Sequence, residues 1–155
     1  MVRLRFLESR KAMASTQTEL QALLDSRVEA CRAKDIDRLM SLYSPNIVYF
    51  DCVPPLHFTG SDAVRRNFLR WFNEYEGEIG LETRDLNIAI SGDVAFAHML
   101  HLDKGNTHLE NGLEFWLRST VCCQRSNNKW LITHEHISLP IKPDLWSTVL
   151  KDIAR

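Results

Sequence analysis

The chain has 155 residues, of which 45% are hydrophobic and 25% are charged, close to an average soluble domain. Its 19 basic and 20 acidic residues nearly cancel, so charge gives no reason to expect nucleic acid or an anionic membrane as a partner. No apolar run approaches the roughly 20 residues that span a bilayer, and the length fits one domain without a membrane segment.

The termini and the cysteines indicate an intracellular protein. Residues 1–15 are basic and partly apolar but lack the apolar core of a signal peptide, and we expect them to form a flexible extension. None of the four cysteines has CxxC spacing, so we expect reduced thiols and a cytoplasmic location. They are Cys31, Cys52, Cys122 and Cys123.

Helical periodicity dominates the first half of the chain. Apolar residues recur at helical spacing over residues 16–33, 35–43 and 62–75, which predicts three helices. Tyr43 and Trp71 fall on the apolar stripes of the second and third helix. Core packing is the default role for both aromatic side chains, and both are also candidates for the wall of a binding pocket.

Strand patterns dominate the second half. Residues 47–53, 81–90, 94–102, 112–124 and 130–139 are the strand candidates, and residues 142–155 predict a helical tail after the domain. Helices followed by antiparallel strands give an α+β order. A sheet that curls around helices leaves a pocket of the kind that binds small molecules. We therefore expect one domain over residues 16–141.

The last strand places two histidines on one face. If residues 126–128 form a three-residue loop, Thr120 lies opposite His134 and Arg118 lies opposite His136. One face then gathers a polar cluster with an aromatic neighbour, Trp116. We expect this face to line the pocket.

Several chemistries are open to this cluster. A histidine pair at this spacing can bind a metal, but it needs a third ligand, which His98, Asp51 or His101 would have to supply. The nearby Arg118 disfavours a cation, and a pocket-lining or structural role is the better interpretation. Arg118 itself, in a largely apolar strand, needs a carboxylate partner or an anionic ligand. His98 shares a strand face with apolar residues and is a core or rim histidine.

Asp51 ends an apolar strand just before two prolines. In such surroundings its pKa would be raised, and the carboxylate could act as a general base. The alternative is that Asp51 caps the turn before Pro54, and spacing alone favours this cap.

Five motifs in order resemble the SnoaL-like branch of the NTF2-like superfamily over about residues 16–141. They are D-I-D-R-L-M-S-L-Y-S-P-N-I-V-Y-F-D, F-T-G-S-D-A-V-R-R-N-F, G-D-V-A-F-A, L-R-S-T and K-W-L-I-T-H-E-H-I-S-L-P. The resemblance implies a cone-shaped α+β barrel with three helices on a strongly curved, mainly antiparallel sheet. It also implies a homodimer and a ligand site inside the cone. This fold carries isomerases, cyclases, dehydratases, hydrolases and non-catalytic domains.

Two groups within the superfamily imply different roles. The segment 28–51 aligns without gaps to the ketosteroid isomerases, which places Asp51 at their general base. Arg27 then stands where those enzymes have an oxyanion-hole tyrosine, and no aspartate near Thr120 matches their second donor. The closing motif resembles the association domain of calmodulin-dependent kinase II instead, where His134 and His136 match a pocket motif.

The sequence therefore predicts a SnoaL-like protein that binds a small carbonyl- or carboxylate-bearing molecule, without a cofactor or a resident metal. If it is an enzyme, Asp51 takes a proton next to a carbonyl, leading to isomerisation, cyclisation or elimination. His136 and His134 are the further acid–base candidates. The expected substrate-binding residues are Arg118, Tyr43, Trp71, Trp116, His98 and Thr120. The alternative is a non-catalytic domain that senses a ligand or assembles oligomers.

Overall fold

The computed structural model describes the backbone of residues 2–145 and the side chains of residues 12–145. Its three helices are α1 (Val2–Arg32), α2 (Ile36–Met40) and α3 (Ser61–Glu74). A single 3₁₀ turn, η1 (Pro143–Leu145), follows the last strand. The rest of the helical tail predicted over residues 142–155 lies outside the described part of the chain. No described helix is long and apolar enough to cross a membrane.

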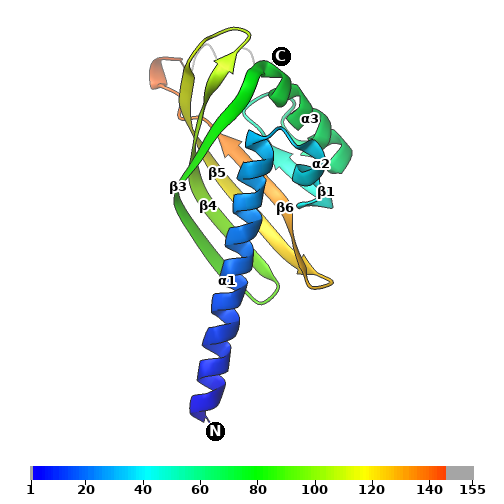
Figure 1. Ribbon diagram of the computed structural model, residues 1–155, viewed down its shortest axis with the longest axis vertical. Coiled ribbons are helices and arrows are strands. Elements are labelled where there is room, and N and C mark those ends of the chain that lie inside the picture. The colour runs from blue at the N-terminus through cyan, green and yellow to red at the C-terminus, as the bar shows by residue number, and fades with distance from the viewer. Residues whose placement is uncertain (1, 146–155) are drawn as a thin grey trace.

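Six strands form one strongly curved sheet. They are β1 (Tyr43–Phe50), β2 (Phe58–Thr59), β3 (Tyr75–Ser91), β4 (Val94–Thr107), β5 (Leu113–Ser126) and β6 (Lys129–Ser138). The strand order is β2-β1-β6-β5-β4-β3, and only the β1–β6 pair is parallel. The three helices pack on the same side of this sheet (Figure 1). The predicted α+β cone is confirmed, and the sheet curls without closing because β2 and β3 remain its two edges.

The first helix is longer than predicted. It begins at Val2 instead of near residue 16, and its N-terminal part projects beyond the sheet (Figure 1). The helix ends where Lys34 adopts a positive φ of 54° and the Asp35 amide bonds the Ala30 carbonyl at 2.9 Å. The Asp35 carboxylate then caps α2 by accepting from the Arg38 amide at 3.0 Å.

Two boundary predictions were wrong. Tyr43 begins β1 instead of ending a helix, because α2 stops at Met40. β4 continues to Thr107, beyond the strand predicted over residues 94–102, because it pairs with the first half of β3. This longer strand matters because it carries Asp103 into the sheet.

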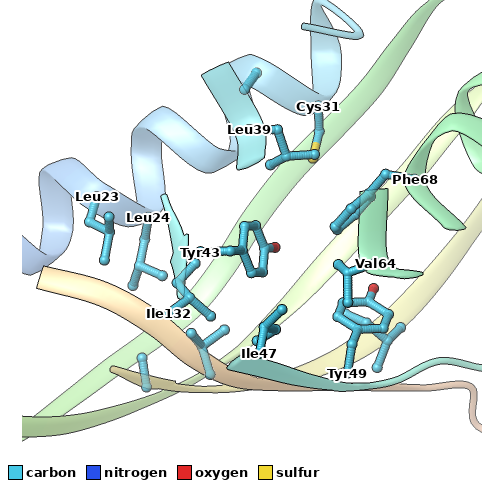
Figure 2. Close-up of a cluster of buried hydrophobic side chains, with 14 of the residues drawn as sticks. Leu23, Leu24, Cys31, Leu39, Tyr43, Ile47, Tyr49, Val64, Phe68 and Ile132 are labelled. Atoms are coloured by element: carbon cyan, nitrogen blue, oxygen red, sulfur yellow. The ribbon is translucent and has the colours of Figure 1, made fainter. Parts of the chain in front are cut away.

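The core lies between the helices and the inner face of the sheet, which is the face that the helices cover. Leu23 and Leu24 of α1, Phe68 of α3 and Ile132 of β6 converge there (Figure 2). The helical spacing of the α1 and α3 residues and the alternation along the strands supply this apolar surface. Burying it is the main driving force of the fold.

The β5–β6 hairpin differs from the predicted register. Its loop has two residues, Asn127 and Asn128, and both have positive φ, as a type I′ turn requires. A bulge at Thr133 follows, because Cys123 pairs with Ile132 while Cys122 pairs with His134. The side chain of Thr133 is anchored to the Cys122 carbonyl at 3.2 Å.

The bulge reverses which residues of β6 face the core. Before it, Trp130 and Ile132 are buried on the inner face; after it, Glu135 and Ile137 are buried. The two histidines of the strand therefore point to the outer face, away from the helices. An uninterrupted strand would have placed them on the same face as Trp130.

Candidate functional site

A cavity of about 190 Å³ lies between α1, α3 and the inner face of the sheet. Its entrance is marked by exposed lining residues, among them Cys52, Arg70 and Glu74. Its deep end is marked by buried ones, including Arg27, His101 and Asp103. The cavity therefore leads from the molecular surface into the core.

The walls of the cavity are largely apolar. Aromatic residues come from β1, α3, β3 and β5, and aliphatic residues come from β3, β5, β6 and the segment after β6. These lining residues are Tyr49, Phe68, Trp71, Tyr75, Leu81, Leu113, Phe115, Leu117, Ile137 and Leu139. Such a composition favours a small organic molecule held by a few polar groups.

A buried ion pair closes the deep end. The Arg27 side chain bonds both carboxylate oxygens of Glu135, one of them from Nε at 3.1 Å. Tyr43 joins this pair, accepting from Arg27 Nε at 3.0 Å and donating to Glu135 at 2.5 Å. Burial acts to lower the pKa of Arg27, but the Glu135 carboxylate outweighs it and raises the pKa further above its usual range. Arg27 is therefore a fixed cation.

One guanidinium nitrogen remains free for a ligand. Arg27 Nη1 is buried and has no hydrogen-bond partner among the described residues, although the side chain lines the cavity. A buried donor without a partner is unfavourable. Arg27 Nη1 is thus a ready donor for an oxygen atom in the cavity.

His101 is the second polar group at this end. Its Nδ1 lies 3.2 Å from the Thr83 hydroxyl, and its Nε2 has no partner within the part of the chain that the structure describes. Burial, together with the positive Arg27, lowers the pKa of His101 to about 3. The imidazole is therefore neutral at pH 7. With the Thr83 hydroxyl donating to Nδ1, Nε2 carries the hydrogen and can donate into the cavity.

Asp103 is the third group, and only 1% of its surface is exposed. Neither of its carboxylate oxygens has a hydrogen-bond partner among the described side chains and backbone. Burial raises the pKa of Asp103 to about 6. The Tyr75 and Trp71 side chains act in the opposite direction, although neither reaches hydrogen-bond geometry.

Asp51 lies nearer the entrance. Its carboxylate accepts from Asn67 Nδ2 and from the Cys52 amide, each at 2.6 Å, and Arg70 Nη2 lies 3.7 Å away. The amide contact is the turn cap considered from the sequence. The same side chain also lines the cavity, so the capping and pocket interpretations of Asp51 both hold for its position.

The remaining predicted site residues fall into two groups, those at the cavity and those on the outer face of the sheet. Trp71 lines the cavity as expected, and Tyr43 lies behind it in the ion-pair network. The others lie on the outer face and do not line this cavity. These are His98, Trp116, Arg118, Thr120, His134 and His136.

The outer-face residues have contacts of their own. His134 Nδ1 lies 2.8 Å from the Val48 carbonyl, and the Phe50 ring lies near the rings of His134 and His136. Arg118 donates to the Leu139 carbonyl at 2.9 Å. In β6, the Thr133 bulge together with the two-residue turn places the histidines on this face. These two features decide which face of β6 meets the helices.

Sequence reasoning missed Asp103 and Glu135 as functional candidates. The pattern of β4 contained a signal: Ala95, Ala97, His101 and Asp103 share one strand face, and small residues suit a face covered by a helix. Glu135 had no such signal, because its inward direction depends on the bulge. Among the described residues, no three His, Cys, Asp or Glu side chains come together as a metal site.

The comparisons with known proteins agree with this architecture. The family model of the SnoaL-like domain matches residues 20–142. A comparison with curated proteins gives no match. Among solved structures, an NTF2-like protein of unknown function from Pseudomonas putida KT2440 has a TM-score of 0.77 and 26% identity over 84% of this chain and 91% of that one.

Two more distant structures share the fold. A hexachlorocyclohexane dehydrochlorinase has a TM-score of 0.74 and 13% identity, over 83% of this chain and 88% of its own. A Xanthomonas campestris protein, provisionally assigned as a calcium/calmodulin-dependent protein kinase II association domain, has a TM-score of 0.71 and 17% identity, over 80% and 87%. The family match and the curved sheet under three helices lead to one conclusion: the chain belongs to the SnoaL-like domain family, within the NTF2-like fold.

Proposed function

We propose that the protein is an enzyme that binds a small organic molecule in the cone cavity and moves a proton next to a carbonyl group. The net result would be an isomerisation, a cyclisation or an elimination. The observation that carries the proposal is a largely apolar cavity with a fixed carboxylate, Asp51, and two buried donors, Arg27 Nη1 and His101 Nε2. Neither donor has a hydrogen-bond partner among the residues that the structure describes. A carboxylate and an oxygen-binding site are the two requirements for this chemistry.

Asp51 would act as the base. The Asn67 amide and the Cys52 backbone amide hold its carboxylate in one orientation, which places it ready for a substrate in the cavity. The substrate carbon would lose a proton to Asp51, and its electron pair would move to the carbonyl oxygen. In an isomerisation the same proton would return at another atom, and in an elimination a leaving group would depart. In a cyclisation the carbanion would attack a second carbonyl carbon of the substrate, and the oxygen formed there would take the proton from Asp51.

Arg27 and His101 would hold that oxygen. Arg27 keeps its charge because of Glu135, and the neutral His101 donates without adding charge. Donors aimed at a developing oxyanion stabilise the transition state more than the ground state. This assignment replaces Arg118 and His136, the oxygen-binding groups expected from the sequence, since those two residues do not line the cavity.

The relatives support this class of reaction. One of the solved structures with the same fold is named as a dehydrochlorinase, an enzyme name that denotes an elimination. At 13% identity this likeness concerns the fold, and the chemistry must be tested on the protein itself.

The proposal predicts exchange of carbon-bound protons. In D₂O, the protein should speed up deuterium incorporation next to the carbonyl of small cyclic ketones such as 2-tetralone, followed by NMR. Asp51→Asn should slow this exchange about 100-fold or more, because it removes the base. Asp62→Asn, an exposed matched change in the first turn of α3, should leave the rate unchanged. Equal rates in the wild type and Asp51→Asn would remove Asp51 from the mechanism.

We also propose that two copies pair through the outer face of the sheet. Large apolar side chains are exposed there, with Phe96 at 51%, Val94 at 52% and Phe50 at 38%. Exposed large apolar side chains are common at protein interfaces. The likeness to the association-domain structure favours assembly as a second role. Light scattering should give the mass of a dimer, and Phe96→Lys should convert it to a monomer; a wild-type monomer would contradict the pairing.

A further inference from the structure

We propose that the cavity selects an uncharged ligand with two oxygens, a carbonyl bound by Arg27 and His101 and a hydroxyl bound by Asp103, and that it rejects carboxylates. This inference deepens the proposed function, and it rests on the same cavity being the ligand site. It narrows the carbonyl- or carboxylate-bearing class expected from the sequence to its neutral members.

The unpartnered groups at the deep end define what the ligand must carry. Arg27 Nη1 and His101 Nε2 are donors that require an acceptor, and a carbonyl oxygen supplies one. The Asp103 carboxylate, with both oxygens unpartnered, requires a donor, and a hydroxyl hydrogen supplies one. A ligand that carries both groups satisfies all three residues together.

The charges of the cavity argue against an anion. Arg27 is the cation at the deep end, but Glu135 already neutralises it through two hydrogen bonds. Asp103 adds a negative charge beside them, without a cationic partner among the described residues. A carboxylate placed there would meet a like charge in surroundings of low dielectric constant, where repulsion is strong.

The residues at the cavity entrance do not make the cavity more attractive to an anion. Asp51 and Glu74 are acidic, and Arg70 is the one basic side chain among the lining residues near the surface. Arg70 is already engaged with Glu74 and lies 3.7 Å from Asp51. The lining residues as a whole therefore carry more negative than positive charge.

The size and spacing fit a single substituted ring. A cavity of about 190 Å³ is somewhat larger than an apolar cavity of about 150 Å³ that holds benzene. His101 and Asp103 occupy successive inward positions of β4, roughly 7 Å apart along the strand. A ring with oxygens on opposite sides spans such a separation, and the aromatic walls can pack on its faces.

Two probes that differ mainly in charge test the inference. 4-(Hydroxymethyl)acetophenone and 4-(hydroxymethyl)benzoate have the same ring and the same hydroxyl, but the second is an anion at pH 8. Their dissociation constants would be measured by isothermal titration calorimetry with the full chain. The neutral ketone should bind at least about tenfold more tightly, because a like charge beside Asp103 disfavours the anion.

Asp103→Asn gives the decisive comparison. Removing the negative charge should tighten benzoate binding about tenfold while changing ketone binding much less, a gain that a damaged fold cannot produce. Asp85→Asn is the matched control, since Asp85 is exposed and its positive φ of 54° suits asparagine. Asp103→Ala carries the same expectation for the benzoate and replaces the asparagine variant if that variant does not fold.

The outcomes separate this inference from the proposed reaction. Tighter binding of the benzoate by the wild type, or no binding of either probe at millimolar concentration, would overturn the inference. An unchanged preference in Asp103→Asn would also overturn it. Deuterium exchange depends on Asp51, so a failed exchange test with intact ketone selectivity would reject the reaction and keep the ligand class.

Discussion

The two faces of the sheet carry the same kinds of residue in different surroundings. On β4, His101 points inward and is 2% exposed, whereas His98 on the same strand is exposed on the outer face. Asp103 is buried with no hydrogen-bond partner in the described part of the chain, whereas Asp93 in the turn before the strand is exposed and pairs with Arg125. Burial, not residue type, gives the inner groups their altered pKa values.

This contrast indicates which face of a curved sheet is suited to ligand binding or catalysis. The inner face has low dielectric constant and few water molecules, so unpartnered polar groups there gain strongly from a ligand. The outer face exposes similar groups to solvent, where hydrogen bonds to water satisfy them. The number or spacing of histidines therefore says little about their function until it is known which face of the sheet they occupy.

The bulge at Thr133 determines which residues of β6 are buried and which are exposed. Of the changes considered, its deletion should reduce the stability of the fold most. Without the extra residue, β6 cannot bury both Ile132 and Glu135, because a one-residue shift reverses every later side chain. Deletion of Thr133 should abolish cooperative thermal unfolding, as followed by circular dichroism. Thr133→Ser keeps the residue count and the hydroxyl, and should remain within about 1 kcal/mol of the wild type. A deletion variant with an unchanged melting curve would contradict this account.

Two ion pairs, one buried and one exposed, predict a smaller but clear difference. Glu135→Gln leaves the buried Arg27 charge without its counter-ion, and should lower the free energy of unfolding by about 3–5 kcal/mol. Asp93→Asn breaks the exposed pair with Arg125 and should cost less than about 1 kcal/mol. Urea denaturation would measure both changes. Similar costs for the two variants would show that burial does not distinguish the pairs.

Asp103 predicts a pH dependence of stability. Its folded pKa is raised from 3.8 to about 6, so ionising it in the folded state costs up to about 3 kcal/mol. This contribution to stability is full below pH 3.8 and is lost as the pH rises through 6. Asp103→Asn removes it, so the variant should gain stability relative to the wild type as the pH rises from 4 to 7.

The difference in stability between the wild type and Asp103→Asn isolates the contribution of Asp103. His101 has the opposite pH dependence, since its lowered pKa causes stability to be lost as the pH falls below 6.5, and it is present in both proteins. Urea denaturation at several pH values would give the comparison. A constant difference between wild type and variant across this range would show that Asp103 keeps an ordinary pKa.

The smallest effect is expected on the outer face. His136→Asn should leave the dissociation constant of 4-(hydroxymethyl)acetophenone within about twofold of the wild type, because distant sites act independently. Isothermal titration calorimetry would measure it. A tenfold loss of affinity would return His136 to the binding site predicted from the sequence.

Much of the fold could be predicted from the sequence. The family, the order of helices before strands and the α+β class followed from ordered motifs and periodicity, which are local properties. Element boundaries were less accurate. Tyr43 and the residues around Asp103 joined strands because pairing with β6 and β3 outweighed their local signals.

The candidate site was predicted only in part. Asp51 and Trp71 line the cavity, and Arg27 had been noted only as a departure from a related family. The polar cluster expected in the pocket does share one face of the sheet, as its alternation indicated. That face is the outer one, and the residues that fill the deep end lie on the other.

The sequence by itself determined that β4, β5 and β6 each have two chemically distinct faces. Strand alternation defines the members of each face in β4 and β5, whereas the bulge changes them partway along β6. In all three strands, alternation does not say which face the helices cover. A two-residue turn and one bulged residue decided that in β6, by placing Glu135 against Arg27 of α1. Such a pairing joins residues distant in the chain, and only the tertiary structure brings them together.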